Sequence, residues 1–235
     1  MPSLFILKTE QILWYYIINK YRRKQIIMSK KITLWTLQHI EAFKTLEKNG
    51  VLYANEQHLF CEDDLCYAYD WLSEQMKERV GPPPDGVNYP IWAWYKWEGK
   101  RKRRDLRCGG YAKRGTPMVQ MEIQIDSDRL LLSDFDRWVN VLNKAYIVED
   151  ENEWDRMDKE LEHLGTDSYH LFTEPVTDTR LLPLKEKIMD TWQTVFQLDT
   201  HMESWDYPLD KRSVQATFWE LRMEDVVKAE HFIAK

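Results

Sequence analysis

Apolar and polar side chains alternate without interruption between Met118 and Asp126. One side of this stretch carries Val119, Met121, Ile123 and Ile125, and the other carries Gln120, Glu122 and Gln124. A period of two residues is typical of a β-strand that buries one of its faces. The chain is therefore constrained to form a sheet, for which its other segments must supply partner strands and covering helices.

Those other segments mix strands with helices. We expect strands at 32–38, 51–53 and 213–221, and helices at 39–49, from Asp63 or Asp64 to about 80, from Ser133 to about 146 and from Pro183 to about 198. Residues 149–182 form a predicted acidic helical insertion, and 224–232 a short helix or strand. Because strands and helices do not alternate regularly, we predict the α+β class, with small mixed or antiparallel sheets and packed helices, in one domain at 28–235.

The stretch from Tyr89 to Arg107 departs furthest from ordinary composition. It holds three tryptophans and a tyrosine within six residues, followed by five consecutive basic residues. Aromatic faces stack on bases or nicotinamide-like rings, and Lys/Arg side chains attract phosphates. The candidate ligand-binding residues are Trp92, Trp94, Arg103, Arg104 and Arg107. The same pattern also fits a two-sided strand whose tryptophans are core, followed by a solvated basic loop.

The distribution of charge favours a small ligand over a polynucleotide. From Lys96 to Arg114, nine Lys/Arg outnumber Glu98 and Asp105, so this segment carries +7. The whole chain carries −6, which leaves −13 for the remainder. Proteins that bind nucleic acid generally spread basic charge over a larger surface. We therefore expect a small anionic ligand, and keep a nucleic-acid-binding module and a protein-interaction domain as alternatives.

Most motifs of established chemistry are absent from the sequence. It lacks the Gly-rich phosphate-binding loop, the dinucleotide fingerprint and the G-x-S-x-G nucleophile elbow. Cys61, Cys66 and Cys108 lack the spacing of a zinc site or a disulfide framework, and we expect no metal and a cytoplasmic location. Asp134 and Asp136 resemble an acid pair, for which helix capping is the simpler explanation.

The first 27 residues have no clear place in this single-domain pattern. Their apolar run from Ile12 to Ile18 is too short to span a bilayer, so we expect no membrane partner. Met28 is a second plausible start. Arg22, Arg23 and Lys24 just upstream can be encoded by purine-rich codons, which is how a bacterial ribosome-binding site reads when translated in frame. We therefore expect residues 1–27 to lie outside the fold, with a true amphipathic N-terminal arm as the alternative.

Three segments together resemble the bacterial domain-of-unknown-function family 3841. They are WAWYKWEGKRKRRDLR, ending at Arg107, LLSDFDRWVNVLN (131–143) and SVQATFWEL (213–221). The resemblance spans nearly all of 28–235 and implies an intracellular bacterial or phage protein without an assigned activity. The sequence departs from the family pattern at Arg104, where proline is common, and at Val139, where histidine is common.

The segment from Leu34 to Leu52 is also similar to the opening of ADP-ribosyltransferase-like folds. That similarity implies an NAD-like ligand held in a cleft, with an aromatic residue stacked on the nicotinamide and a late acidic residue near the ribose. Here Thr36 replaces the expected His or Arg, and Gln215 stands near the place of the catalytic glutamate. A neutral amide stabilises developing positive charge less well than a carboxylate. Glu220 and Glu122 are the substitute candidates.

Deleting residues 1–27 tests their predicted independence from the fold. We expect the shortened chain to keep its melting temperature and solubility, because the deleted apolar run contributes no predicted core element. Thermal unfolding followed by circular dichroism measures the effect. A loss of several degrees would show instead that these residues pack on the domain.

Overall fold

The computed structural model describes residues 30–54, 65–110, 112–203 and 206–235. Ile32–Lys235 form one compact unit. The segment 1–27 and the predicted caps Asp63 and Asp64 lie outside the described residues. Helices and antiparallel strand pairs are mixed along the rest of the chain, which confirms the α+β class.

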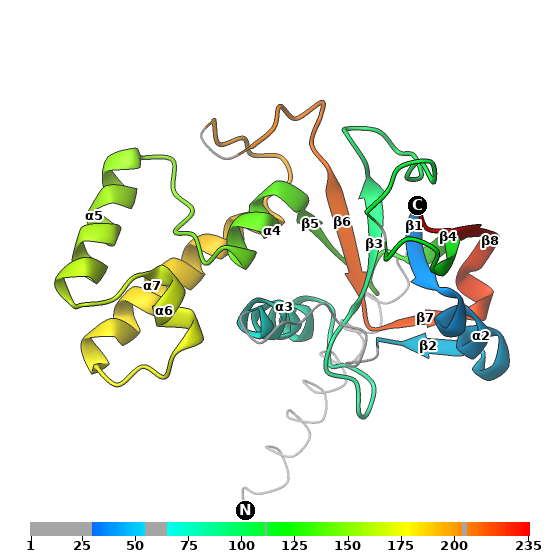
Figure 1. Ribbon diagram of the computed structural model, residues 1–235, viewed down its shortest axis with the longest axis horizontal. Helices are drawn as coiled ribbons and strands as arrows, with labels where there is room; N and C mark the ends of the chain where they lie inside the picture. The colour runs from blue at the N-terminus through cyan, green and yellow to red at the C-terminus, as the bar shows by residue number, and fades with distance from the viewer. Residues whose placement is uncertain (1–29, 55–64, 111, 204–205) are drawn as a thin grey trace, which may run out of the picture. The chain divides into compact units, whose positions relative to one another are not determined.

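Six strands form the main sheet in the order β5–β6–β3–β1–β4–β8 (Figure 1). Their bounds are β1 (Lys31–His39), β3 (Ile91–Lys96), β4 (Pro117–Asp126), β5 (Leu131–Asp134), β6 (Val214–Phe218) and β8 (Val226–Ile233). The pairs β1–β3, β3–β6, β5–β6 and β4–β8 are antiparallel. A second sheet pairs β2 (Val51–Tyr53) with β7 (Glu220–Arg222), also antiparallel.

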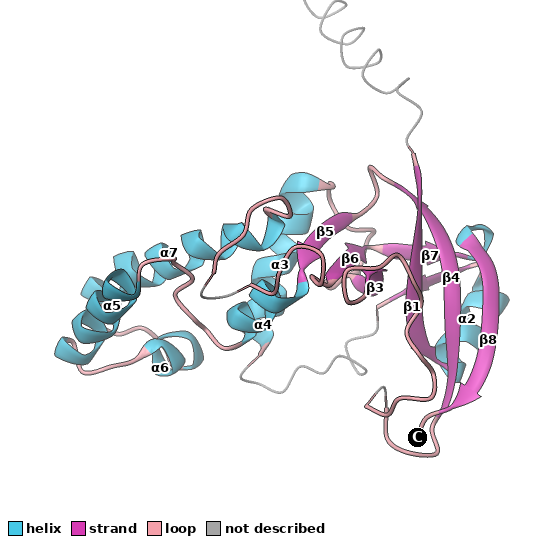
Figure 2. Ribbon diagram, turned by 90° about the horizontal axis from the view of Figure 1, so that it is seen from above, coloured by secondary structure: helices cyan, strands magenta, loops and turns pink. Residues whose placement is uncertain are grey.

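The helices fall into two groups. The described helices are α2 (Ile40–Asn49), α3 (Cys66–Arg79), α4 (Phe135–Leu142), α5 (Glu151–His163), α6 (Ser168–Thr173) and α7 (Leu182–Thr191), with short 3₁₀ turns η2 (Thr179–Leu181), η3 (Trp192–Phe196) and η4 (Met223–Asp225). Figure 2 shows α3 to α7 on the β5 side of the main sheet and α2 beside β4 and β8.

One core lies between the main sheet, α2 and the small sheet. The alternation predicted for β4 is present, because Val119, Met121, Ile123 and Ile125 are all fully buried there. Helix α2 contributes Phe43 and Leu46 and ends at Gly50. With a φ of 75°, Gly50 adopts the left-handed conformation that favours glycine, and its N–H caps the helix.

A second core lies among α3, α4, α5, α6, α7 and η3. At its centre Trp192 is fully buried, and its indole N–H donates to the carbonyl of Ala145 at 2.8 Å. The rings of Trp71 and Phe172 pack against it at centroid distances of 5.6 and 4.8 Å. The predicted insertion at 149–182 is helical, but α5 buries Met157 and Leu161 in this core.

Four buried charged side chains tie the helices to the sheet. Arg137 in α4 donates to both carboxylate oxygens of Asp206, at 2.7 and 2.6 Å. Arg212, just before β6, reaches Asp206 at 2.7 Å and Asp134 at 2.9 Å. Two positive and two negative charges therefore offset each other where solvent is excluded. We call Asp134, Arg137, Asp206 and Arg212 the ionic cluster.

Other details differ from the sequence-based expectations. Asp134, not Ser133, caps α4, because its carboxylate accepts from the N–H groups of the first turn. The strand expected at 213–221 divides at Trp219 into β6 and β7, which belong to different sheets. For the segment 224–232, the strand alternative is confirmed, because β8 follows the short turn η4. Cys66 is disulfide-bonded, although the cysteine spacing indicated no disulfide framework.

No helix among the described residues is long and apolar enough to cross a membrane.

Replacing Asp206 with Asn should destabilise the fold by about 3–5 kcal/mol, because Arg137 and Arg212 then lose the charge that compensates their burial. Urea unfolding measures the loss. Asp178→Asn is the matched control, since it breaks an exposed Asp–Arg pair on η2 and should cost far less. Equal losses in the two variants would contradict a special role for the buried cluster.

Candidate functional site

Antiparallel pairing places four side chains in one line across the main sheet. Trp35 in β1 lies opposite Trp94 in β3, Trp94 lies opposite Gln215 in β6, and Gln215 lies opposite Ser133 in β5. Paired residues of antiparallel strands project from the same face. We call these four residues the cross-strand row. It brings together two sequence-predicted site residues, Trp94 and Gln215, that are remote in sequence.

Two polar groups of the row lack hydrogen-bond partners. Within the described part of the chain, the Ser133 hydroxyl and the Gln215 side-chain oxygen are buried without a partner. Such groups are uncommon in folded proteins, and water or a ligand often accounts for them. Ser133 is fully buried, so the partly buried Gln215 is the one of these two groups that a donor from outside the protein can approach.

Glu122, the third catalytic candidate, adjoins the other end of the row. It lies in β4, on the polar side of the strand, and accepts from the indole N–H of Trp35 at 3.4 Å. This is a long hydrogen bond, and both side chains are only partly buried. A carboxylate thus stands beside the aromatic part of the row.

The basic segment, Lys96–Arg114, begins with a tight turn directly after β3. Trp97 and Lys100 exchange two backbone hydrogen bonds around Glu98 and Gly99. A side chain at Gly99 would begin 1.6 Å from the backbone oxygen of Asp210, so only glycine fits this close approach. The turn is consequently fixed against the chain that leads into β6.

Arg101, which was not among the sequence-based candidates, fastens the basic segment to the sheet. Its guanidinium donates to the backbone carbonyls of Tyr95 and Thr33. It also lies 3.7 Å from the ring centroid of Tyr95 and 5.3 Å from that of Trp35. Burial lowers the pKa of Arg101. These contacts give Arg101 a positioning role.

Arg104 extends the aromatic surface of the row. Its guanidinium lies 3.5 Å from the ring centroid of Trp97 and 5.2 Å from that of Trp94. The indole of Trp94 in turn meets Trp97 and Phe135 edge-on, at 4.7 and 5.2 Å. Stacking restrains a guanidinium while its N–H groups point outward in its plane. A cation is therefore held beside the half-buried Trp94.

Arg103 and Arg107, the other predicted basic residues, form exposed ion pairs. Arg103 pairs with Glu230 in β8. Arg107 binds Asp105 at 2.7 Å, and its hydrogen bonds hold the pKa of that carboxyl well below its usual range. Exposed pairs contribute little stability, so an incoming anion can compete with these carboxylates at low cost.

Trp92 faces the helices. Its ring lies 5.1 Å from Trp138 and 6.1 Å from Tyr69, which places it against the helical core. The core interpretation of the tryptophan pattern therefore applies to Trp92, whereas Trp94 adjoins the basic segment.

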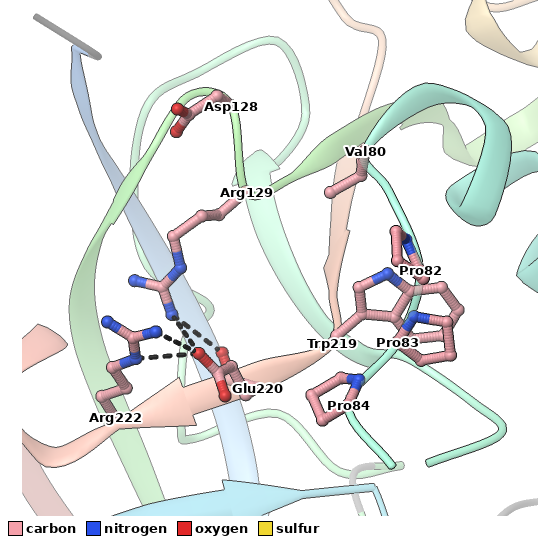
Figure 3. Close-up of a pocket in the computed structure, with 9 residues that line it drawn as sticks. All are labelled: Val80, Pro82, Pro83, Pro84, Asp128, Arg129, Trp219, Glu220 and Arg222. Carbon is pink, nitrogen blue, oxygen red and sulfur yellow. Dashed lines mark hydrogen bonds and ion pairs between the residues drawn. The ribbon is translucent and has the colours of Figure 1, made fainter. Parts of the chain in front are cut away.

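Glu220 lies apart from the row, in a pocket of about 350 Å³ (Figure 3). One side of this pocket is apolar and is formed by Val80, Pro82, Pro83, Pro84 and Trp219. The other side is charged and is formed by Asp128, Arg129, Glu220 and Arg222. Of these residues, only Glu220 was a sequence-based candidate. Trp219 and Arg222 are its near neighbours in sequence, whereas Asp128, Arg129 and the prolines come from distant segments. The three prolines indicated only the end of a helix.

Two arginines bind the Glu220 carboxylate. Arg222 donates to Oε1 through Nε at 2.8 Å and reaches it through Nη2 at 2.6 Å. Nη2 of Arg129 lies 3.6 Å from the same oxygen, while its Nη1 contacts the buried Asp225 at 3.2 Å. Glu220 is thus held in place by charges.

The acid pair at Asp134 and Asp136 is divided between two roles. Asp134 caps α4, which confirms the helix-capping interpretation for this residue, and it also belongs to the ionic cluster. Burial, together with the charges of Asp134 and Asp206, raises the pKa of Asp136 to about 6. No group of three or more potential metal ligands occurs among the described residues.

Comparison with known proteins identifies a family. The model of the family described as Domain of unknown function (DUF3841) matches residues 33–227, most of the chain. Neither the curated proteins nor the solved structures contain a match.

Asp136→Asn should stabilise the protein at neutral pH. A raised carboxyl pKa contributes stability below the unfolded-state pKa near 4, and this stability is lost as pH rises through about 6. We expect equal stabilities near pH 4 and an advantage of about 1 kcal/mol for the variant at pH 7.5, after discounting for partial exposure. Urea unfolding at three pH values measures it.

Asp178→Asn provides a comparison of opposite sign. The Arg180 hydrogen bond lowers the pKa of Asp178, so this variant should lose stability above pH 4. A pH-independent difference for Asp136→Asn would contradict the assignment.

Proposed function

The chain belongs to the family Domain of unknown function (DUF3841), and from the geometry of its sheet we propose that it binds a small anionic ligand with a planar ring, of the nucleotide or NAD-like class. The proposed site is the cross-strand row with the adjoining turn and basic segment. A cytoplasmic location in a bacterium is part of the same proposal.

The observation that carries this proposal is the register joining Trp35, Trp94 and Gln215. It sets two partly buried indoles beside an amide whose oxygen has no partner among the described residues. A base or nicotinamide ring offers both a face for stacking and polar N–H groups at its edge. Aromatic and amide groups next to each other therefore match such a ring.

The basic segment supplies the complement to phosphate. Arg104 is stacked beside Trp94, and the segment carries +7 within a chain of net charge −6. Because Arg103 and Arg107 engage exposed carboxylates, phosphate oxygens can replace those partners. Local rather than dispersed charge favours a ligand with few phosphates.

Tryptophan fluorescence should be quenched by mononucleotides or NAD, with a shallow dependence on salt. Duplex DNA binding loses about 0.9 in log affinity per contacted phosphate for each tenfold rise in salt, so a small ligand shows a small slope. Combined Arg103→Ala, Arg104→Ala and Arg107→Ala substitutions should weaken binding at least about tenfold. Circular dichroism checks that the variant is folded.

The matched control removes three exposed positive charges elsewhere. It combines Arg156→Ala, Lys159→Ala and Arg180→Ala, in which Arg180 forms the same local pair with Asp178 that Arg107 forms with Asp105. If both triple variants weakened binding equally, the effect would reflect the net charge of the protein and not the proposed site. Steep, length-dependent binding of oligonucleotides without any response to mononucleotides would replace the proposal with nucleic-acid binding.

A further inference from the structure

The pocket at Glu220 has two unlike sides that face each other across its opening. Figure 3 shows Trp219 and the prolines on one side and the Arg129–Glu220–Arg222 group on the other. Its volume of about 350 Å³ lies at the lower end of the range for small-molecule sites. An occupant therefore needs a short apolar part and a charged part close together.

The apolar side is rigid. Trp219 is 6% exposed, and its indole N–H donates to the carbonyl of Gly81 at 2.9 Å. This bond fixes the ring against the Pro82–Pro84 segment, whose proline rings have few conformations. A side chain that packs here loses little entropy through rearrangement of the protein.

The charged side is balanced in sign. Arg129 and Arg222 contribute two positive charges, and Glu220 and Asp128 contribute two negative charges. Behind them, the 2% exposed Asp225 holds Arg129 in position. Such a lining offers no excess of positive charge to a phosphate, which distinguishes it from the basic segment. It matches a ligand that carries one charge of each sign.

The geometry points to a free α-amino acid with an apolar side chain as the ligand of this pocket. Its carboxylate binds the exposed guanidinium of Arg222 beside Arg129, and its ammonium binds Glu220. Both arginines contact Oε1 of Glu220, so Oε2 can accept from the ammonium. The side chain packs against the Pro82–Pro84 segment beside Trp219. This site is separate from the proposed nucleotide site and does not depend on it.

Isothermal titration with L-phenylalanine and L-leucine tests the proposal on the full chain. L-phenylalaninamide lacks the carboxylate, and N-acetyl-L-phenylalanine lacks the ammonium. We expect each derivative to bind at least about tenfold more weakly than L-phenylalanine, because each loses one charge-assisted contact. Binding of a derivative as tightly as the free amino acid would overturn the proposal, as would the absence of binding at millimolar L-phenylalanine and L-leucine.

Glu220→Gln should weaken L-phenylalanine binding about tenfold, since the amide keeps the shape of the side chain but loses its charge. Glu224→Gln is the matched control: Glu224 also contacts Arg222, at 3.6 Å, but does not line the pocket. Equal weakening in both variants would contradict a direct contact with Glu220. Urea unfolding of both variants separates loss of binding from loss of fold.

Discussion

The alternation of side chains along strand β3 separates the two hydrophobic cores of the domain. This strand lies between β6 and β1, and its two faces contribute to different hydrophobic cores. Ile91 and Ala93 belong to the core shared with α2, whereas Trp92 packs against the helical core. Since side chains alternate along a strand, Trp94 projects to the same side as Trp92. There it meets Phe135 at the start of α4 and Arg104 of the basic segment, which sets the position of the candidate ligand site.

Charges in this protein serve two different purposes according to their burial. Arg137 and Asp206 have fully buried side chains, and their pairing offsets a large cost of desolvation. Burial alone would raise the pKa of Asp206, but hydrogen bonds from Arg137 and Met202 outweigh it and lower that pKa. Arg107 and Asp105 also pair closely, yet both are exposed, so their separation costs little. Structural ion pairs and pairs that a ligand can displace therefore differ in burial more than in geometry.

Local sequence signals predicted the elements well. Alternation located β4, and Gly50 marked the end of α2, because both signals act between near neighbours. The sequence could not predict the sheet order, since Trp94 and Gln215 meet only through long-range pairing. For the same reason, the sequence indicated the candidate residues but not which of them lie together. Long-range contact also explains why Arg129, whose partners Glu220 and Asp225 come from the other end of the chain, was missed.

The division at Trp219 also narrows the catalytic candidates. Gln215 and Glu220 are five residues apart on the run from β6 to β7, which corresponds to roughly 16 Å of extended chain. The Glu220 carboxylate lines a pocket to which no residue of the row contributes, and two arginines already hold it. Glu122 instead adjoins Trp35 in the row itself. If the proposed site performs transfer chemistry that requires a carboxylate beside a sugar, Glu122 is the candidate that the sheet geometry favours, and Gln215 is limited to hydrogen bonding.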